Sequence, residues 1–96
     1  MAPHFQWDPA KAKTNRQKHG ISFEEAQSVF YDENARFIAD PEHHGDEQRF
    51  LLLGISSNPR ILVVCHCYRE AESEIRLISA RRATKKEQAL YWGRIR

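Results

Sequence analysis

The stretch that decides the fold is SEIRLISARRATKKEQALY, residues 73–91. In residues 74–77 charged and apolar side chains alternate, which is the two-residue period of a β-strand with unlike faces. Thr84, followed three residues later by Glu87, forms a capping box that predicts the start of a helix. We therefore expect the strand to stop near Ala80 and to lead directly into a C-terminal helix.

Three arginines lie on or beside this strand: Arg76, Arg81 and Arg82. Arginine is costly to hold beside a core unless it is paired or used, and its two parallel donors suit phosphate. The pattern is compatible with solvated arginines at a sheet edge or with an anion-binding strand. Strict alternation puts Arg76 and Arg81 on opposite faces unless a β-bulge intervenes or the strand ends first. Of these two alternatives we expect that the strand ends first. The Arg81 side chain then lies over the site and is catalytic, whereas Arg82 has only a positioning role.

Capping and turn residues divide the rest of the chain. Asp8-Pro9 begins a helix that Gly20 ends, and Ser22 with Glu25 begins a second one. The expected elements are a strand Phe5–Trp7, a helix Pro9–His19, a helix with Phe23, Ala26, Val29 and Phe30 on one face, and strands Ala35–Ala39, Arg49–Ser56 and Arg60–Arg69.

The resulting order, β-α-α-β-β-β-β-α, predicts an α+β sandwich with an antiparallel meander and all three helices on one face. With 96 residues, the chain is expected to form a single domain, residues 1–96. Net charge is only +2, but the C-terminal part is basic and residues 32–47 are acidic. This asymmetry favours a phosphate-bearing or acidic partner.

Several classes of protein are disfavoured by what the sequence contains. No apolar run approaches the ~20 residues that span a bilayer, and the N-terminus has no signal-peptide pattern. Cys65 and Cys67 are too far apart on one strand face for a normal disulfide, which favours the cytoplasm. Glycine-rich phosphate loops, nucleophile elbows and HExxH are not found, so we expect no NTPase, hydrolase with such an elbow or metalloprotease.

Histidine and cysteine side chains raise the question of zinc. His43, His44, Cys65, His66 and Cys67 supply suitable atoms. On a strand, however, His66 points away from both cysteines, and the adjacent histidines are not a normal ligand pair. We expect no metal and no cofactor.

A polar set on the long strands could cleave RNA through the RNA's own 2′-hydroxyl. That reaction needs a base, cations that stabilise a phosphorane, and an acid for the leaving oxygen. His66 or Glu47 could be the base and the arginines the cations. A satisfied histidine in or beside the core is the alternative interpretation of His66.

Four motifs in series resemble one family. They are W-D-x-x-K from Trp7, N-x-x-K-H-G-I-S-F-E-E-A from Asn15, R-x-I-S-A-R-x-A from Arg76, and the later Glu87 and Tyr91. Together they cover nearly the whole chain and are similar to the BrnT-type toxins of type II toxin–antitoxin pairs, within the RelE-like superfamily.

The resemblance implies a RelE-like antiparallel sheet packed against helices, and an endoribonuclease that arrests translation. It implies a ribbon-helix-helix, BrnA-like antitoxin, with operator DNA bound only through that antitoxin. The expected catalytic residues are Glu47, Arg49, His66, Arg69, Arg76 and Arg81. The expected RNA-binding residues are Lys18, His19, Arg82 and Tyr91. The alternative is a catalytically silent partner of a DNA-binding antitoxin that acts in operon repression.

Overall fold

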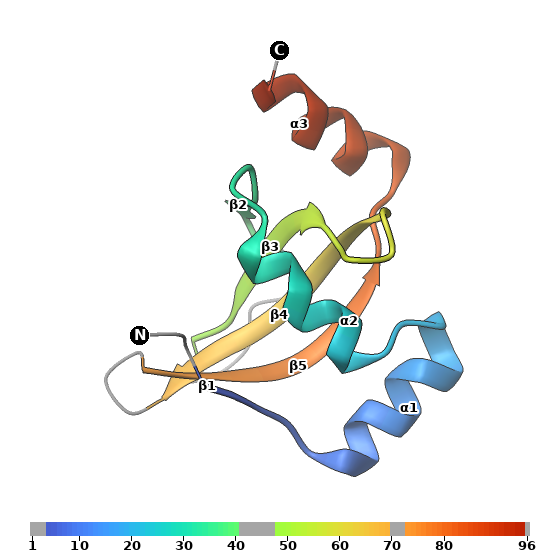
Figure 1. Ribbon diagram of the computed structural model, residues 1–96, viewed down its shortest axis with the longest axis vertical. Coiled ribbons are helices and arrows are strands. Elements are labelled where there is room, and N and C mark those ends of the chain that lie inside the picture. The colour runs from blue at the N-terminus through green and yellow to red at the C-terminus, as the bar shows by residue number, and fades with distance from the viewer. Residues whose placement is uncertain (1–3, 41–47, 70–72, 96) are drawn as a thin grey trace.

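The predicted order of elements is confirmed by the computed structural model, which describes residues 4–40, 48–69 and 73–95 (Figure 1). A short 3₁₀ turn, η1, is added after the second helix. The elements are β1 His4–Gln6, α1 Pro9–His19, α2 Phe23–Ser28, η1 Val29–Tyr31, β2 Arg36–Ile38, β3 Phe50–Ile55, β4 Ile61–Arg69, β5 Glu74–Arg82 and α3 Lys85–Ile95.

The strands form one sheet in the order β1-β5-β4-β3-β2. The meander β2 to β5 is antiparallel throughout, as predicted. β1 instead joins the first half of β5 in parallel, so the sheet is mixed. That pairing joins the first strand of the chain to the last, and nothing in the local sequence indicated it.

Local capping explains where the helices begin. The Asp8 side chain accepts a hydrogen bond from the backbone N–H of Ala10, and Gly20 takes the left-handed conformation, with φ 70°, that ends α1. Thr84 and Glu87 make both reciprocal bonds of the predicted capping box at the start of α3.

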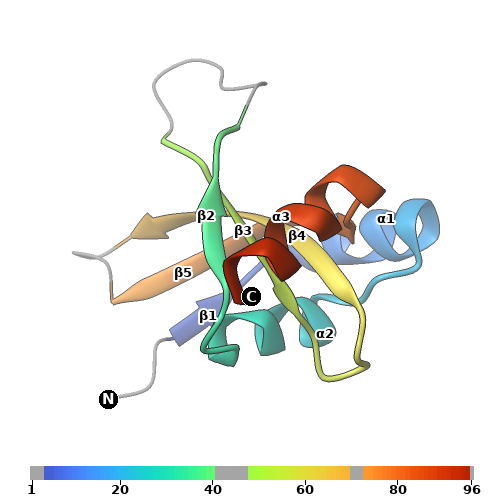
Figure 2. The same cartoon turned by 90° about the horizontal axis from the view of Figure 1, so that it is seen from above.

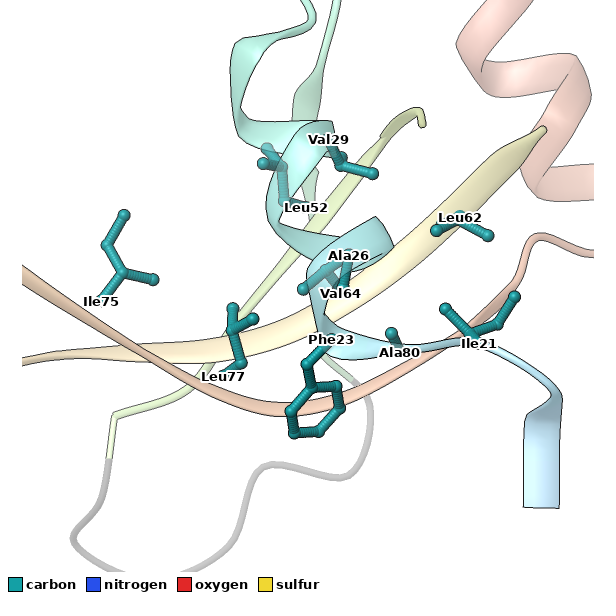
Figure 3. Close-up of a cluster of buried hydrophobic side chains, with 10 residues drawn as sticks. All are labelled: Ile21, Phe23, Ala26, Val29, Leu52, Leu62, Val64, Ile75, Leu77 and Ala80. Carbon is teal, nitrogen blue, oxygen red and sulfur yellow. The ribbon is translucent and has the colours of Figure 1, made fainter. Parts of the chain in front are cut away.

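α2 lies across one face of the sheet, and α1 lies against β5 beside it (Figure 1). We call this side the helix face. Its core joins apolar side chains of α2 and the preceding turn to inward-facing residues of β3, β4 and β5 (Figure 3). The buried members are Ile21, Phe23, Ala26, Val29, Leu52, Leu62, Val64, Ile75, Leu77 and Ala80.

α3 lies on the opposite face, so the expectation that all three helices share one face is wrong (Figures 1 and 2). Tyr91 packs there with a separate cluster of sheet residues that includes Leu53 and Val63. Only residues 83 and 84 join β5 to α3. Because Ala83 packs in that same cluster, the short connection directs α3 onto this side. None of the helices in the described ranges is long and apolar enough to cross a membrane.

Candidate active site

A β-bulge in β5 decides which arginines share a face. Cys65 and His66 are adjacent on β4, but they pair with β5 residues two positions apart, which leaves Ile78 without a partner on β4. Such an extra residue shifts the alternation of the bulged strand by one. β5 also continues to Arg82, so the expectation that it stops near Ala80 is wrong.

The bulge brings Arg76 and Arg81 to the same face of the sheet, opposite the helix face. Arg81 pairs with Val63, which belongs to the cluster beneath α3. Arg82 instead pairs with Leu62 of the helix-face core. We call the surface that carries Arg76 and Arg81 the arginine face.

The arginine face carries Arg69 at the end of β4, Arg76 near the start of β5, and Arg49. α3 lies at the other end of the sheet (Figure 1). Arg69 ends β4 and pairs with Glu74, two residues before Arg76. Arg49 directly precedes β3; burial raises the pKa of the nearby Cys65 thiol, and the charge of Arg49 opposes that rise. Two arginines on neighbouring strands and a third directly before β3 therefore belong to one surface.

Arg76 donates to a neutral amide, which itself contacts a carboxylate. Its Nη1 donates to Oε1 of Gln6 at 3.1 Å, and the Gln6 amide in turn donates to the Glu74 carboxylate. β1 supplies Gln6, so the unexpected parallel strand orients both side chains. Sequence reasoning did not single out Gln6 or Glu74 as site residues.

Arg81 has a different environment, because its charge is matched by a carboxylate. Its Nη1 and Nη2 donate to the two oxygens of Glu87 at 2.8 and 2.9 Å. These bonds, with a smaller contribution from Thr84, lower the pKa of Glu87 to about 2 although burial opposes them. The ion pair joins β5 to the first turn of α3.

His66 lies in the interior on the helix face. Its imidazole is 0% exposed and is surrounded by the rings of Phe30, Phe37, Phe50 and Tyr68. The ring nitrogens lie 3.2 Å from the Val64 carbonyl oxygen and 3.3 Å from the Tyr68 hydroxyl. Burial lowers the pKa of His66 to about 4. The position favours the core interpretation and gives no support to the expected catalytic role.

Tyr91 is also interior, with 2% of its surface exposed. Its hydroxyl donates to Oδ2 of Asp32 at 2.7 Å, and the same oxygen accepts the N–H of Ile55 at 2.8 Å. Burial, helped by Asp32, raises the pKa of Tyr91 to about 12. Tyr91 thus anchors α3 to β3, and its position does not support the expected RNA contact.

Lys18 and His19 lie in a third place, at the end of α1. They line a cleft of about 310 Å³ between α1 and the edge of β5 near Ile78. They are therefore next to the bulge and not beside the three arginines. Glu47, the other base expected from the sequence, lies outside the described residues, as do His43 and His44.

The two cysteines are unpaired thiols, buried on the arginine face. His66 points to the other face, as strand alternation requires. Within the described ranges, no group of three His, Cys, Asp or Glu side chains is placed to hold a metal ion.

Asn15 is a structural residue that sequence reasoning missed. Its amide accepts from the N–H of Ala80 at 3.0 Å and donates to the carbonyl oxygens of Ala80 and Ile21 at 2.9 and 3.0 Å. It thereby pairs with the edge of β5 as a neighbouring strand would. The first residue of the N-x-x-K-H-G motif was the available signal, since it is an asparagine on the inner side of a polar helix.

A mixed sheet of this topology has a counterpart among solved structures. The fold is similar to the crystal structure of the Brucella abortus ribonuclease toxin BrnT, with a TM-score of 0.66 and 22% identity. The match covers 88% of this chain and 100% of that one. At this identity the likeness establishes the fold alone. A search among curated proteins found no match.

The sequence itself establishes the family. The protein-family model described as "Ribonuclease toxin, BrnT, of type II toxin-antitoxin system" matches residues 7–87 of the sequence. The chain therefore belongs to the BrnT family of ribonuclease toxins, and the resemblance inferred from the four motifs is confirmed. A type II toxin implies a cognate antitoxin as its partner.

Proposed function

We propose that the chain is a metal-independent endoribonuclease whose active site is the open end of the arginine face. The observation that carries the proposal is that Arg69 and Arg76 lie on one face of β4 and β5, with Arg49 directly before β3 and near Cys65 of that face. Fixed guanidinium donors suit the negative charge that develops on a pentavalent phosphorus. They can supply the stabilisation that a metal ion supplies in other nucleases.

The reaction uses the RNA's own 2′-hydroxyl. Its oxygen attacks the adjacent phosphorus while its proton passes to a base. The bond to the 5′-oxygen breaks, that oxygen takes up a proton, and a 2′,3′-cyclic phosphate remains. We assign the base role to Glu74, the described carboxylate that Gln6 links to Arg76. Glu47 stays a prediction from the sequence.

Within this proposal Arg76 ranks above Arg81. Glu87 binds both terminal nitrogens of Arg81 directly, whereas Arg76 donates to the neutral amide of Gln6 and contacts Glu74 only through it. Arg81 is then mainly a structural link between β5 and α3.

The test is cleavage of a long RNA by purified protein, with and without EDTA. Cleavage should survive the chelator, and the products should end in 2′,3′-cyclic or 3′-phosphate. Arg76→Ala should lower the rate about 10²–10³-fold, the usual effect of removing a group that stabilises transition-state charge. Arg16→Ala, an exposed change of equal charge on α1, is the matched control.

Arg81→Ala should keep more activity than Arg76→Ala but melt at a lower temperature, because it releases α3. Cleavage that EDTA abolishes and zinc or magnesium restores would disprove metal independence. An Arg81→Ala variant that is fully folded yet inactive, beside an active Arg76→Ala, would reverse the ranking.

In the cell, the proposed consequence is RNA cleavage in the cytoplasm and arrest of translation. Family membership supports a cognate antitoxin, and we propose a ribbon-helix-helix protein, through which alone the toxin reaches operator DNA. Induction of the toxin without its antitoxin should stop the incorporation of labelled amino acids, and induction of Arg76→Ala should not.

A further inference from the structure

The two adjacent arginines at the end of β5 serve different surfaces. Arg81 is paired on the arginine face, while the Arg82 side chain lines a cavity of about 270 Å³ at the α3 end of the sheet. Gln88 and Trp92, four residues apart on α3, line the same cavity. The cavity therefore lies between one face of α3 and the loop that joins β3 to β4, at the opposite end of the sheet from Arg49, Arg69 and Arg76.

The charge in this cavity comes from Arg82. Arg60 also lines it, but its guanidinium donates to both oxygens of Glu25 at 2.6 and 2.7 Å, so these two charges cancel. Among the described residues, the side chain of Arg82 has no hydrogen-bond partner. Besides Arg60, the charge of Arg82 also helps, as the smallest contribution, to lower the pKa of Glu25. Two arginines therefore share one carboxylate, which leaves one positive charge in excess, and Arg82 is exposed.

Trp92 supplies an accessible aromatic surface beside that charge. It is 43% exposed, and its ring is held edge-on by Tyr91, with ring centroids 5.1 Å apart. The Tyr91 hydroxyl is hydrogen-bonded to Asp32, so the ring that packs against the indole is itself fixed in place. The Gln88 amide nitrogen donates to the Ala83 carbonyl oxygen at 3.2 Å, and the amide oxygen is a further acceptor beside the cavity.

We propose that this cavity is a second nucleotide subsite, in which a base of single-stranded RNA stacks on Trp92 while Arg82 binds the adjacent phosphate. An aromatic ring beside a guanidinium is the usual means of holding a single strand without reading its sequence. The subsite extends the proposed ribonuclease function, because it lets a strand cut on the arginine face be held at the far end of the sheet. A nucleotide matches both groups at once, because its base has a π-face for Trp92 and its phosphate has oxygens for Arg82.

Tryptophan fluorescence can test the subsite without any cleavage. The chain has two tryptophans, so Trp7→Phe leaves Trp92 as the only indole. Titration of this variant with a 2′-O-methyl oligonucleotide, which cannot react, should quench its fluorescence. The same oligonucleotide made abasic should bind more weakly and quench little, because stacking is lost.

Two substitutions separate the contacts. Trp92→Phe should weaken binding of the intact oligonucleotide several-fold, and Trp92→Ala about tenfold or more. Arg82→Ala should weaken binding. It should also make the slope of log affinity against log salt concentration less steep, by the amount that corresponds to about one phosphate contact. Arg16→Ala is the matched control, and it should change neither the quenching nor the difference between intact and abasic RNA.

The proposal is overturned if the oligonucleotide does not quench Trp92, or if Trp92→Ala and Arg82→Ala bind it as the parent does. It is also overturned if these variants lose only antitoxin binding, which would make the cavity a protein interface. Failure of the proposed catalytic function would look different: the 2′-O-methyl strand would still bind and quench, while ordinary RNA stayed uncut.

Discussion

At the scale of single residues, His66 shows how burial sets protonation. Its pKa is about 4 in the folded protein and 6.5 in an ordinary environment. Between pH 6.5 and about pH 4, His66 is protonated in the unfolded chain but not in the folded chain. The free energy of unfolding should therefore fall as the pH falls from 6.5 to 4, and His66 should contribute no pH dependence above about pH 7.

His66→Gln, which keeps polar atoms but cannot titrate in this range, should remove that part of the pH dependence. Urea unfolding of both proteins at several pH values between 7.5 and 4 measures the difference. The same variant should still cut RNA at pH 7.5. A folded His66→Gln protein without cleavage would return His66 to the site as the base.

Residue type alone does not determine the surroundings of these side chains, and the reason is physical. Residue type indicated that arginines would act and that His66 would be either catalytic or a core residue. The choice for His66 depended on aromatic rings brought from η1, β2 and β3, which lie far away along the chain. The pairing of Arg76 with a neutral amide and of Arg81 with a carboxylate depended in the same way on tertiary contacts.

At the scale of elements, α1 replaces a missing strand beside the second half of β5. β1 pairs only with Glu74, Ile75 and Arg76. Further along, the Asn15 side chain satisfies the backbone of Ala80, with both groups buried. Edges of sheets must be paired or covered, and here a single amide makes the pairing.

Asn15→Ala should destabilise the protein by about 2–4 kcal/mol, because a buried N–H and buried carbonyls lose partners that cost roughly 1–3 kcal/mol each when left unsatisfied. Asn15→Asp keeps the acceptor but turns an oxygen toward two carbonyls, so it should also be destabilising despite equal size. Urea denaturation gives both values. Gln17→Ala, exposed on the same helix, is the control; equal stability of Asn15→Ala and Gln17→Ala would remove Asn15 from this role.

Most element boundaries followed from short-range chemistry, which explains why they could be predicted. Asp8, Gly20, Thr84 and Glu87 act within one turn of helix, and all four do so as expected. The bulge at Ile78 could not be predicted, because a bulge is an offset between two strands and not a property of one. The face taken by α3 and the parallel pairing of β1 also depend on contacts distant in sequence.

At the scale of the whole molecule, the two faces of the sheet are covered to different extents. α2 crosses the helix face, whereas α3 covers one end of the arginine face and leaves the arginines at the other end (Figure 1). On the proposed function, an antitoxin that blocks catalysis should cover that positively charged end. We expect it to offer acidic residues there.

Co-expression with the cognate antitoxin should give a complex that elutes as one peak in size-exclusion chromatography and does not cut RNA. Arg69→Glu should weaken the complex, because it reverses one charge of the open end, whereas Arg16→Glu on α1 should not. A toxin that elutes alone beside its antitoxin would disprove the association, and equal affinities of the two variants would place the interface elsewhere.

The bulge at Ile78 has a consequence for how the length of this chain can change during evolution. β5 contains one residue more than its pairing with β4 needs. A deletion at this point would straighten the ladder and leave every other side chain of β5 on its present face. A deletion in the middle of β4, which has no such spare residue, would turn half of that strand over. Insertions and deletions compatible with activity should therefore collect at one position in the sheet.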